Sequence, residues 1–504
     1  MGTSSLRYVK LGWVFAISVC LLLSWQARNT LTGAAMGADA NQNLTMAYNL
    51  YVNGILSLAT QPPFVATDLR EPLPPMVTAL FLALYPDINH AVPLASFFQG
   101  EHARLIKQVN VPWIFLGLLG TWVLTHILCC SHRGALLAVL SAYLFFFGVS
   151  QFTDTLYTEI PAAVIILWTA VALVSLTRCR GLLAPILSGL LFGMLALTKA
   201  VFLYICVPII LLLILYYTLG RRQMNAPPQW AAITALMVAF VMVVSFWMVR
   251  NKVALDRFEI SGRGGDVLLV RALKNEMSRH EVVGAWWYWG PSLYRKLVSG
   301  TALNANDADF AAGGKFQRLN RYASAVGDRA AMAAGKPEDA VSFYFQSWAW
   351  HRRFSQQPTV PRSQDTTAAA DVLLKRKALE MIFRAPGTHL AMTPLFLWRG
   401  IWCFPDVGLP YLAPGYRLYL INALDAIAYL SLFSVFAIGL ARRRYDLVAM
   451  TVVPVAMLAF YAVFSHNIPR YSAPMIPIML VSILVILSGK LGAGPRDPGD
   501  LQRV

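Results

Sequence analysis

The sequence predicts an all-α polytopic membrane protein, and three observations lead to that prediction. Of its 504 residues, 57% are hydrophobic and 13% are charged, whereas soluble domains average about 25% charged residues. Apolar runs of roughly 17–25 residues, long enough to cross a bilayer as helices, recur along the chain. Strand-like alternation is absent, and helices satisfy their own backbone polar groups in lipid.

We expect roughly ten transmembrane helices. They are predicted at 9–27, 111–130, 134–150, 161–177, 182–198, 201–219, 230–249, 417–440, 446–464 and 472–489. An even number of crossings returns the carboxy end to the side of the amino end. The segments 76–84 and 391–404 are apolar but short, so they are re-entrant or interfacial pieces or a further pair of crossings.

The net charge of +17 does not indicate a nucleic-acid partner, because of where the charges lie. They gather in short connecting segments, which is typical of the positive-inside rule for cytoplasmic loops. The residues concerned are Arg7, Lys10, Arg133, Arg178, Arg180, Arg221, Arg222, Arg442, Arg443, Arg444, Lys490, Arg496 and Arg503. The six cysteines show neither a disulfide framework nor zinc-site spacing.

Three parts of the chain follow from this threading. Residues 1–250 form a transmembrane catalytic half with seven helices and a long first outer loop at 28–110. Residues 251–395 form a second outer region, in which 371–384 has helical periodicity. Residues 396–504 hold the C-terminal transmembrane helices. Outer segments of such length usually have a function, for example in gating or in binding an acceptor.

Four cations lie at the outer ends of different predicted helices, against the charge bias of the chain: Arg70, Lys199, Arg250 and Arg470. Each alone has a local explanation, such as an ion pair in a turn or a side chain that snorkels to the interface. Their occurrence at one membrane level favours a shared ligand, and phosphate is the anion that such cations bind.

Two lone carboxylates are predicted in the same layer. Asp39 is the only carboxylate before Asp68, and it is either a solvated helix cap or a general base. Glu159 precedes Pro161 at the start of a helix, where it either interacts with the helix dipole or faces a functional cavity. Glu71, Tyr157 and Tyr471 flank these groups; together with Glu159 and Arg250 they are candidates for supporting or substrate-binding roles.

The chain resembles the GT-C superfamily of integral membrane glycosyltransferases, and within it the protein O-mannosyltransferase and lipid A aminoarabinose transferase branch. The resemblance covers nearly the whole length and rests on the order of short motifs. These are Asp39 in the first outer loop, Arg70-Glu71-Pro72-Leu73, Thr158-Glu159, the turn ending at Thr198-Lys199, Trp247 with Arg250-Asn251, and Arg470-Tyr471 with Pro474. Two departures are Ala40, where the family has a second acidic residue, and Pro74, where it has an aromatic one.

The resemblance implies transfer of a hexosyl or pentosyl group from a polyprenyl-phosphate-linked donor to a glycan, lipid or protein acceptor. It implies Asp39 as the catalytic base and Arg70, Lys199 and Arg470 as donor-phosphate ligands. A transporter or flippase of lipid-linked saccharides and a polymerase or ligase of lipid-linked glycans are the alternatives.

No cofactor is expected, and the histidines form no metal motif, although a divalent ion on Asp39 and Glu159 is left open. The absence of disulfide candidates and the compact outer loops favour a bacterial inner membrane, with the site on the periplasmic face.

Overall fold

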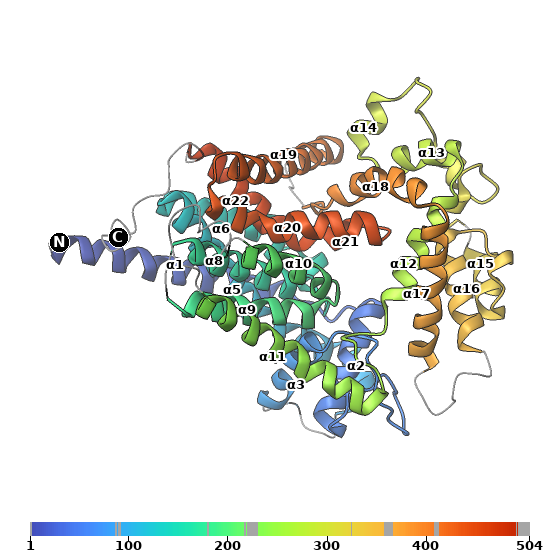
Figure 1. Cartoon of the computed structure of the whole chain (residues 1–504), viewed down its shortest axis with the longest axis horizontal. Helices are drawn as coiled ribbons and strands as arrows, with labels where there is room; N and C mark the ends of the chain where they lie inside the picture. Colours follow the sequence, from blue (N-terminus) through green and yellow to red (C-terminus); the bar gives the residue numbers. More distant parts are fainter. Residues whose placement is uncertain are drawn as a thin grey trace.

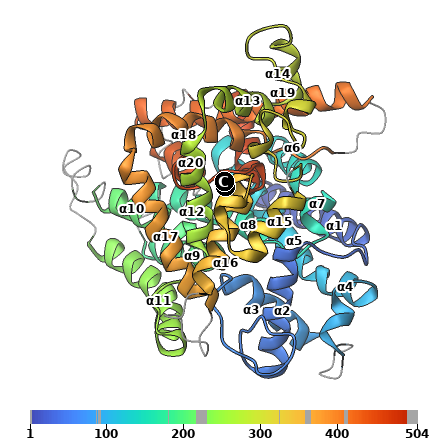
Figure 2. The ribbon, with the colours of Figure 1, turned by 90° about the vertical axis from the view of Figure 1, so that its right-hand side faces the viewer.

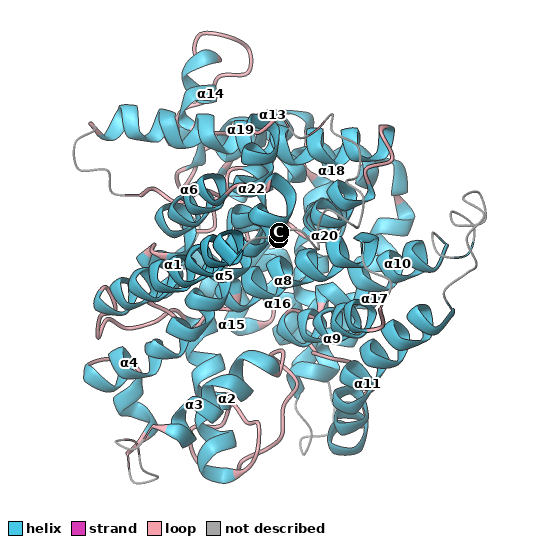
Figure 3. Cartoon of the chain, turned by 90° about the vertical axis from the view of Figure 1, so that its left-hand side faces the viewer, coloured by secondary structure: helices cyan, strands magenta, loops and turns pink. Residues whose placement is uncertain are grey.

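The computed structural model describes residues 3–85, 88, 92–178, 181–215, 218, 230–323, 325–356, 366–407, 413–489 and 491. Several predicted basic positions lie outside these residues: Arg180, Arg221, Arg222, Lys490, Arg496 and Arg503. Residues 216, 217 and 219 of the predicted span 201–219 also lie outside them. The described residues form helices joined by loops and contain no strand, as Figure 3 shows. The predicted all-α class is confirmed.

The chain is a multi-pass membrane protein. Seven helical segments of the described residues are long and apolar enough to cross a bilayer. They are Leu11–Asn29 in α1 (Thr3–Asn29), Glu101–Cys129 in α4 (Glu101–Ile106) and α5 (Asn110–Cys129), α8 (Glu159–Arg178), α11 (Trp230–Leu255), α19 (Pro414–Ala441), α20 (Tyr445–Phe464), and Pro469–Leu487 in α21 (Pro469–Ser472) and α22 (Ile476–Leu487). Each matches a predicted span.

The other three predicted spans are shorter apolar helices: α6 (His132–Ala142) with its extension to Phe147, α9 (Leu183–Thr198) and α10 (Val201–Leu215). α9 has 16 residues, so it is about 24 Å long, whereas the hydrocarbon layer is about 30 Å thick. The short apolar segment 76–84 is helical within α3 (Leu73–Leu84), and residues 391–401 of the other are helical within α18 (Pro386–Ile401).

Helix α8 lies inside the apolar bundle and connects most of it. It packs against α5, α9 and α20, while α11 covers α9 and α19 contacts both α20 and α22 (Figure 1). The apolar sequence Ile160–Leu167 is buried along α8. At the far end of the helix, Arg178 donates to Asp446 at 2.9 Å. Glu159, in the first turn of α8, is therefore held at the opposite end of a well-packed helix.

Two further groups of helices adjoin the bundle at that end. α2 (Ala38–Asn53), α3 and α4 surround an apolar cluster that includes Leu44, Leu82 and Phe97. Helices α12 to α18 surround another apolar cluster, and Figure 2 shows this group in front of the bundle. Its helices are α12 (Gly264–Leu273), α13 (Arg279–Trp289), α14 (Ser292–Leu297), α15 (Ala325–Ala334), α16 (Phe343–Ser355), α17 (Thr366–Arg384) and α18.

The helix predicted at 371–384 lies within α17, so its helical character is confirmed. Helix α7 (Ser150–Thr153) is a single turn between α6 and α8. α11 continues five residues past the predicted boundary at residue 250 and ends at Leu255. The boundaries of the three parts stay predictions.

A substitution at the α9–α11 contact tests the packing of the bundle. A Cβ at Gly189 would overlap the carbonyl oxygen of Leu236 and would touch Ala239. We expect Gly189→Ala to separate the two helices and to lower stability by about 1–3 kcal/mol. The measurement is the thermal unfolding midpoint of the purified protein in detergent. Gly415→Ala in α19 is the control, because nothing lies within 4 Å of its Cβ position; equal midpoints for the two variants would contradict this packing.

Candidate functional site

Three arginines from distant parts of the sequence contact the carboxylate of Asp39, in the first turn of α2. Oδ1 accepts hydrogen bonds from Arg70 and, at 3.1 Å, from Arg263. Oδ2 accepts one from Arg470 at 2.7 Å. The Asp39 side chain is 24% exposed, so the carboxylate stays accessible from outside. Asp39 is thus the centre of an ion cluster; the N-cap of α2 is Gly37, so Asp39 does not cap the helix.

Burial and nearby positive charge act in opposite directions on the pKa of Asp39. Burial alone would raise the pKa of the carboxyl group, but Arg263, Arg70 and Arg470 outweigh it and hold the pKa well below its usual range. Asp39 is therefore ionised at any physiological pH. A carboxylate in this state is a poor proton acceptor for as long as all three arginines contact it.

Arg470 extends the cluster to α8. Its Nε lies 3.1 Å from Oε1 of Glu159, and its guanidinium lies 4.4 Å from the centroid of the Tyr157 ring. Lys199 donates to the same Glu159 oxygen at 3.3 Å. Glu159 is 1% exposed. Six predicted site residues therefore meet in one network: Asp39, Arg70, Arg470, Glu159, Lys199 and Tyr157.

The Arg70-Glu71 element joins this network at two points. Arg70 is 6% exposed, and its Nε donates to Oε1 of Gln42 at 2.8 Å. Glu71 accepts from the backbone N–H of Ala200 at 3.1 Å. Gln42 and Asp39 thus orient Arg70, while Glu71 holds the turn that carries Lys199.

Arg263 was not among the predicted site residues. It follows α11 in a loop whose backbone is fixed by Trp247, which donates to the carbonyl of Ile260 at 3.0 Å, and by Asn251, which donates to that of Glu259 at 2.8 Å. The N–H of Gly262 donates to the carbonyl of Asp68 at 3.0 Å. The only signal in the sequence was the glycine-rich run around Arg263, which matches no phosphate-binding pattern.

Arg250 lies apart from the Asp39 network in the described structure. Its guanidinium is 4.8 Å from the Trp247 ring and donates to Oδ1 of Asn251 at 2.9 Å. It thus folds back along its own helix, onto two residues that fix the Arg263 loop. Tyr471 stacks on Tyr461 with centroids 5.0 Å apart, directly after Arg470.

A buried clamp positions the segment that leads to Asp39. Lys107 is fully buried, and its Nζ donates to the carbonyls of Thr32 and Ala34 at 2.9 and 2.8 Å. It also donates to Asp154 at 3.0 Å, and Asp154 accepts from the N–H of Thr32 at 2.8 Å. The clamp ties the chain before α2 to the loop before α8, so Asp39 and Glu159 are held together.

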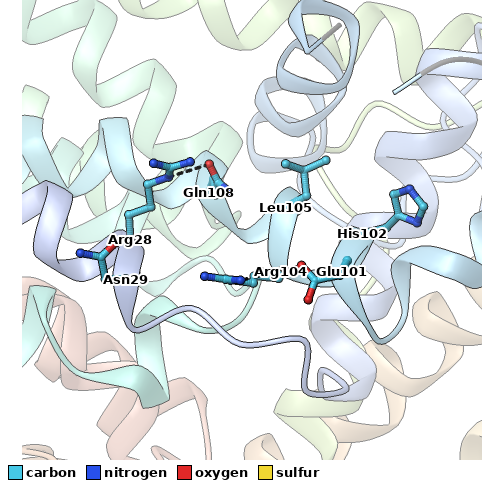
Figure 4. A pocket seen from close by; sticks show the side chains of 7 residues that line it. All are labelled: Arg28, Asn29, Glu101, His102, Arg104, Leu105 and Gln108. Carbon is cyan, nitrogen blue, oxygen red and sulfur yellow. Dashed lines mark hydrogen bonds and ion pairs between the residues drawn. The ribbon is translucent and has the colours of Figure 1, made fainter. Parts of the chain in front are cut away.

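Within the described residues, no group of three His, Cys, Asp or Glu side chains could hold a metal ion. The divalent ion left open for Asp39 and Glu159 stays untested. A hollow of about 390 Å³ lies elsewhere and is drawn in Figure 4. It is lined by Arg28, Asn29, Glu101, His102, Arg104, Leu105 and Gln108, and none of these contributes to the Asp39 network.

Comparisons with known proteins give structural similarity at low sequence identity. No protein-family model and no curated protein matches the chain. The chain is similar to the archaeal oligosaccharyltransferase AglB from Archaeoglobus fulgidus, solved with an inhibitory peptide and a dolichol-phosphate, at 15% identity and a TM-score of 0.45. The alignment covers 94% of this chain and 50% of AglB, so the chain spans about half the length of that protein.

The chain is also similar to ArnT from Cupriavidus metallidurans, bound to undecaprenyl phosphate, at 14% identity and a TM-score of 0.36. This alignment covers 94% of the chain and 78% of ArnT. At these values we assign neither family nor activity from the similarity, and the function is argued from the site itself.

Breaking the Glu159–Lys199 pair tests the buried half of the network. Glu159→Gln leaves Lys199, whose side chain is 10% exposed, without a counter-ion, and we expect a loss of about 3 kcal/mol of unfolding free energy. Glu159→Gln/Lys199→Met should recover part of it, because the unpaired charge is then gone. Thermal unfolding of the single and double variants measures the coupling.

Glu338→Gln is the control for this pair. Glu338 binds Arg353 at 2.7 Å on the surface, with the side chain 60% exposed, so its loss should leave the unfolding midpoint unchanged. A Glu159→Gln variant as stable as Glu338→Gln would contradict a buried, coupled pair.

Proposed function

We propose that this chain is a membrane glycosyltransferase that moves a sugar from a polyprenyl-phosphate-linked donor to an acceptor on the outer face of the membrane. The observation that carries the proposal is the arrangement of Asp39. Its partly exposed carboxylate contacts three arginines. Arg70 comes from the loop between α2 and α3, Arg263 from the loop after α11, and Arg470 from α21. This arrangement supports a base and phosphate-binding cations at one site.

The charges of this cluster favour a phosphate ligand. The cations Arg70, Arg263, Arg470 and Lys199 outnumber the carboxylates Asp39, Glu159 and Glu71. Arginine grips phosphate through two parallel N–H donors, which lysine cannot do. A donor phosphate that enters beside Asp39 would replace it as the partner of one or more arginines.

The reaction is a single displacement at the anomeric carbon. The acceptor oxygen or nitrogen forms the new glycosidic bond, and the bond between the anomeric carbon and the phosphate oxygen breaks. The electron pair leaves with polyprenyl phosphate, whose charge the arginines stabilise. Asp39 takes the proton of the acceptor, and the configuration at the anomeric carbon inverts.

Phosphate binding and base strength are coupled in this arrangement. While the arginines contact Asp39, they hold its pKa low and the carboxylate is a weak base. When they turn toward the donor phosphate, the positive charge that lowers the pKa is shared with the donor, and Asp39 becomes a stronger proton acceptor. Donor binding thus precedes activation of the acceptor.

The proposal also includes the compartment of the site and two competing functions. We place the site on the periplasmic face of a bacterial inner membrane, as expected from the compact outer segments and the positions of the basic residues. Transport of lipid-linked saccharides and polymerisation or ligation of lipid-linked glycans are the other outcomes of the test. The second shares the phosphate-binding cations but transfers an oligosaccharide.

The decisive test is sugar transfer in membranes supplied with radiolabelled polyprenyl-phosphate sugars. Asp39→Asn should lower the rate by about 10²–10⁴-fold if Asp39 is the base. Asp406→Asn is the control, because Asp406 lies in an exposed pair with Arg417. Unchanged transfer by Asp39→Asn would move the base to Glu159 or Asp68, and labelled lipid that changes leaflet without transfer would make the chain a transporter.

Arg263 supplies an independent test, because only the three-dimensional arrangement points to it. Arg263→Met should lower kcat/KM for the donor by roughly 10–150-fold, the equivalent of one charge-assisted hydrogen bond of about 1.5–3 kcal/mol. Initial rates against donor concentration measure this. Arg352→Met, at an exposed position of α16, should match the wild type; equal kinetics for both variants would remove Arg263 from the site.

A further inference from the structure

A second group of basic side chains lies beside the Asp39 network, at the junction of the bundle and the outer helices. We call it the Lys274 cluster, and its members are Arg271, Lys274, Arg399 and His466. Lys274 is 5% exposed and Arg271 is fully buried. No member forms an ion pair with a carboxylate in the part of the chain that the structure describes. The cluster thus differs from the Asp39 network, in which every cation faces an acid.

Aromatic rings bring these cations together. The Lys274 ammonium lies 4.9 Å from the centroid of Trp289, and Arg399 lies 4.4 Å from that ring. Arg271 lies 4.0 Å from Phe396, which also faces Lys274 at 5.8 Å. The Trp289 and Phe396 centroids are 5.6 Å apart. Three positive charges thus converge on two adjoining rings.

The charge of Lys274 has fewer polar contacts to stabilise it than the charges of Arg271 and Arg399. Arg271 donates to the carbonyl of His389 at 2.8 Å, and Arg399 donates to that of His466 at 2.9 Å. The Lys274 ammonium has its ring contacts and no hydrogen-bond acceptor among the described residues. A buried cation without a counter-ion is costly, and its like-charged neighbours increase the cost.

The pKa values show the same imbalance. Burial, together with Arg399, Arg271 and Arg321, holds the pKa of Lys274 well below its usual range. Burial also lowers the pKa of His466, and Lys274, Arg399, Arg321 and Arg263 lower it further. An anion among these groups would relieve the repulsion that both residues experience.

The Lys274 cluster adjoins the Asp39 network through two residues. The ring of Tyr471, next to Arg470 in sequence, meets the ring of His466 edge to face at 5.6 Å. Arg263 contacts Asp39 at 3.1 Å, and its charge also acts on His466. Tyr471 and Arg263 thus link the Lys274 cluster to the Asp39 network.

We infer that the Lys274 cluster is a second phosphate-binding subsite, beside the site that holds the sugar-bearing phosphate. The inference rests on the proposed function only for the origin of that phosphate. Two sources supply the same chemistry: the second phosphate of a lipid diphosphate donor, or a phosphate group carried by the acceptor. In either case the subsite explains why unpaired cations are buried next to a paired cluster.

Anion binding without turnover tests the subsite separately from the proposed activity. The purified full chain is titrated with inorganic phosphate and pyrophosphate against chloride at equal ionic strength, with the unfolding midpoint as the readout. We expect both anions to raise the midpoint of the wild type. Lys274→Met and Arg399→Met should each weaken the apparent anion affinity at least tenfold.

The matched control is Lys377→Met. Lys377 also lies over a tryptophan, 4.0 Å from the Trp350 ring, but outside the cluster. It should respond to phosphate like the wild type. Lys274→Met should also be at least as stable as the wild type without added anion, because it removes an unpaired buried charge. Two results together would make Lys274 a purely structural residue and overturn the inference. These are a Lys274→Met midpoint below that of the wild type without anion, and a wild-type midpoint that does not change with phosphate.

The source of the phosphate is decided with lipid and acceptor probes. If Lys274→Met weakens binding of a polyprenyl diphosphate but not of the monophosphate, the donor supplies the second phosphate. If both lipids bind as in the wild type and only a phosphorylated acceptor shows a raised KM, the acceptor supplies it. Inorganic anions that bind while neither probe responds would mark an adventitious ion site and would overturn the inference. Loss of transfer in Asp39→Asn has no bearing on these binding results.

Discussion

The contact between one carboxylate and three guanidinium groups is the constraint on which the rest of this structure depends. Asp39 lies at the start of α2, while its partners lie near residue 70, after α11 and at the beginning of the last helix. Each of these charges would be costly to bury alone at the end of an apolar bundle. Because they satisfy one another, four distant segments can meet there, and the carboxylate remains partly exposed to a ligand.

Much of the surrounding structure keeps these four segments in place. Lys107 and Asp154 hold the chain before α2, and Glu71 holds the turn before α10. The loop of Arg263 is fixed to α11 by Trp247 and Asn251. These supports are mostly hydrogen bonds from side chains to backbone groups, so they fix the course of the chain. In the proposed function, the charged groups around Asp39 exchange partners when a ligand enters.

The distribution of charge separates two environments that lie side by side. Around Asp39, cations and carboxylates are paired and a ligand must compete for the arginines. Around Lys274, cations are gathered over aromatic rings, and none of them pairs with a carboxylate among the described residues. In a site of low dielectric, this difference matters, because an anion gains most where no counter-ion is already present. We therefore expect the Asp39 network to exchange ion-pair partners when an anion enters, and the Lys274 cluster to retain the anion.

The sequence by itself determined the helical class, most of the membrane spans and most members of the Asp39 network. Long apolar runs permit few structures in lipid, so composition alone decided the class. Asp39, Arg70, Lys199, Glu159 and Arg470 stood out because a charge at the end of an apolar helix is conspicuous. α6, α9 and α10 were predicted as spans; in the described residues they are shorter apolar helices, which pack against α5, α8 and α20, respectively.

Only the tertiary structure decided which charges meet. Arg263 lies in a polar, glycine-rich loop where an arginine is ordinary, and its part in the network depends on contacts with Asp68 and α11. Arg250 stood out for the same reason as Arg470, but its side chain lies along its own helix on Trp247. The Lys274 cluster joins residues between 271 and 466 that no spacing relates. Electrostatic partners are set by distance in space, and a sequence gives distance only along the chain.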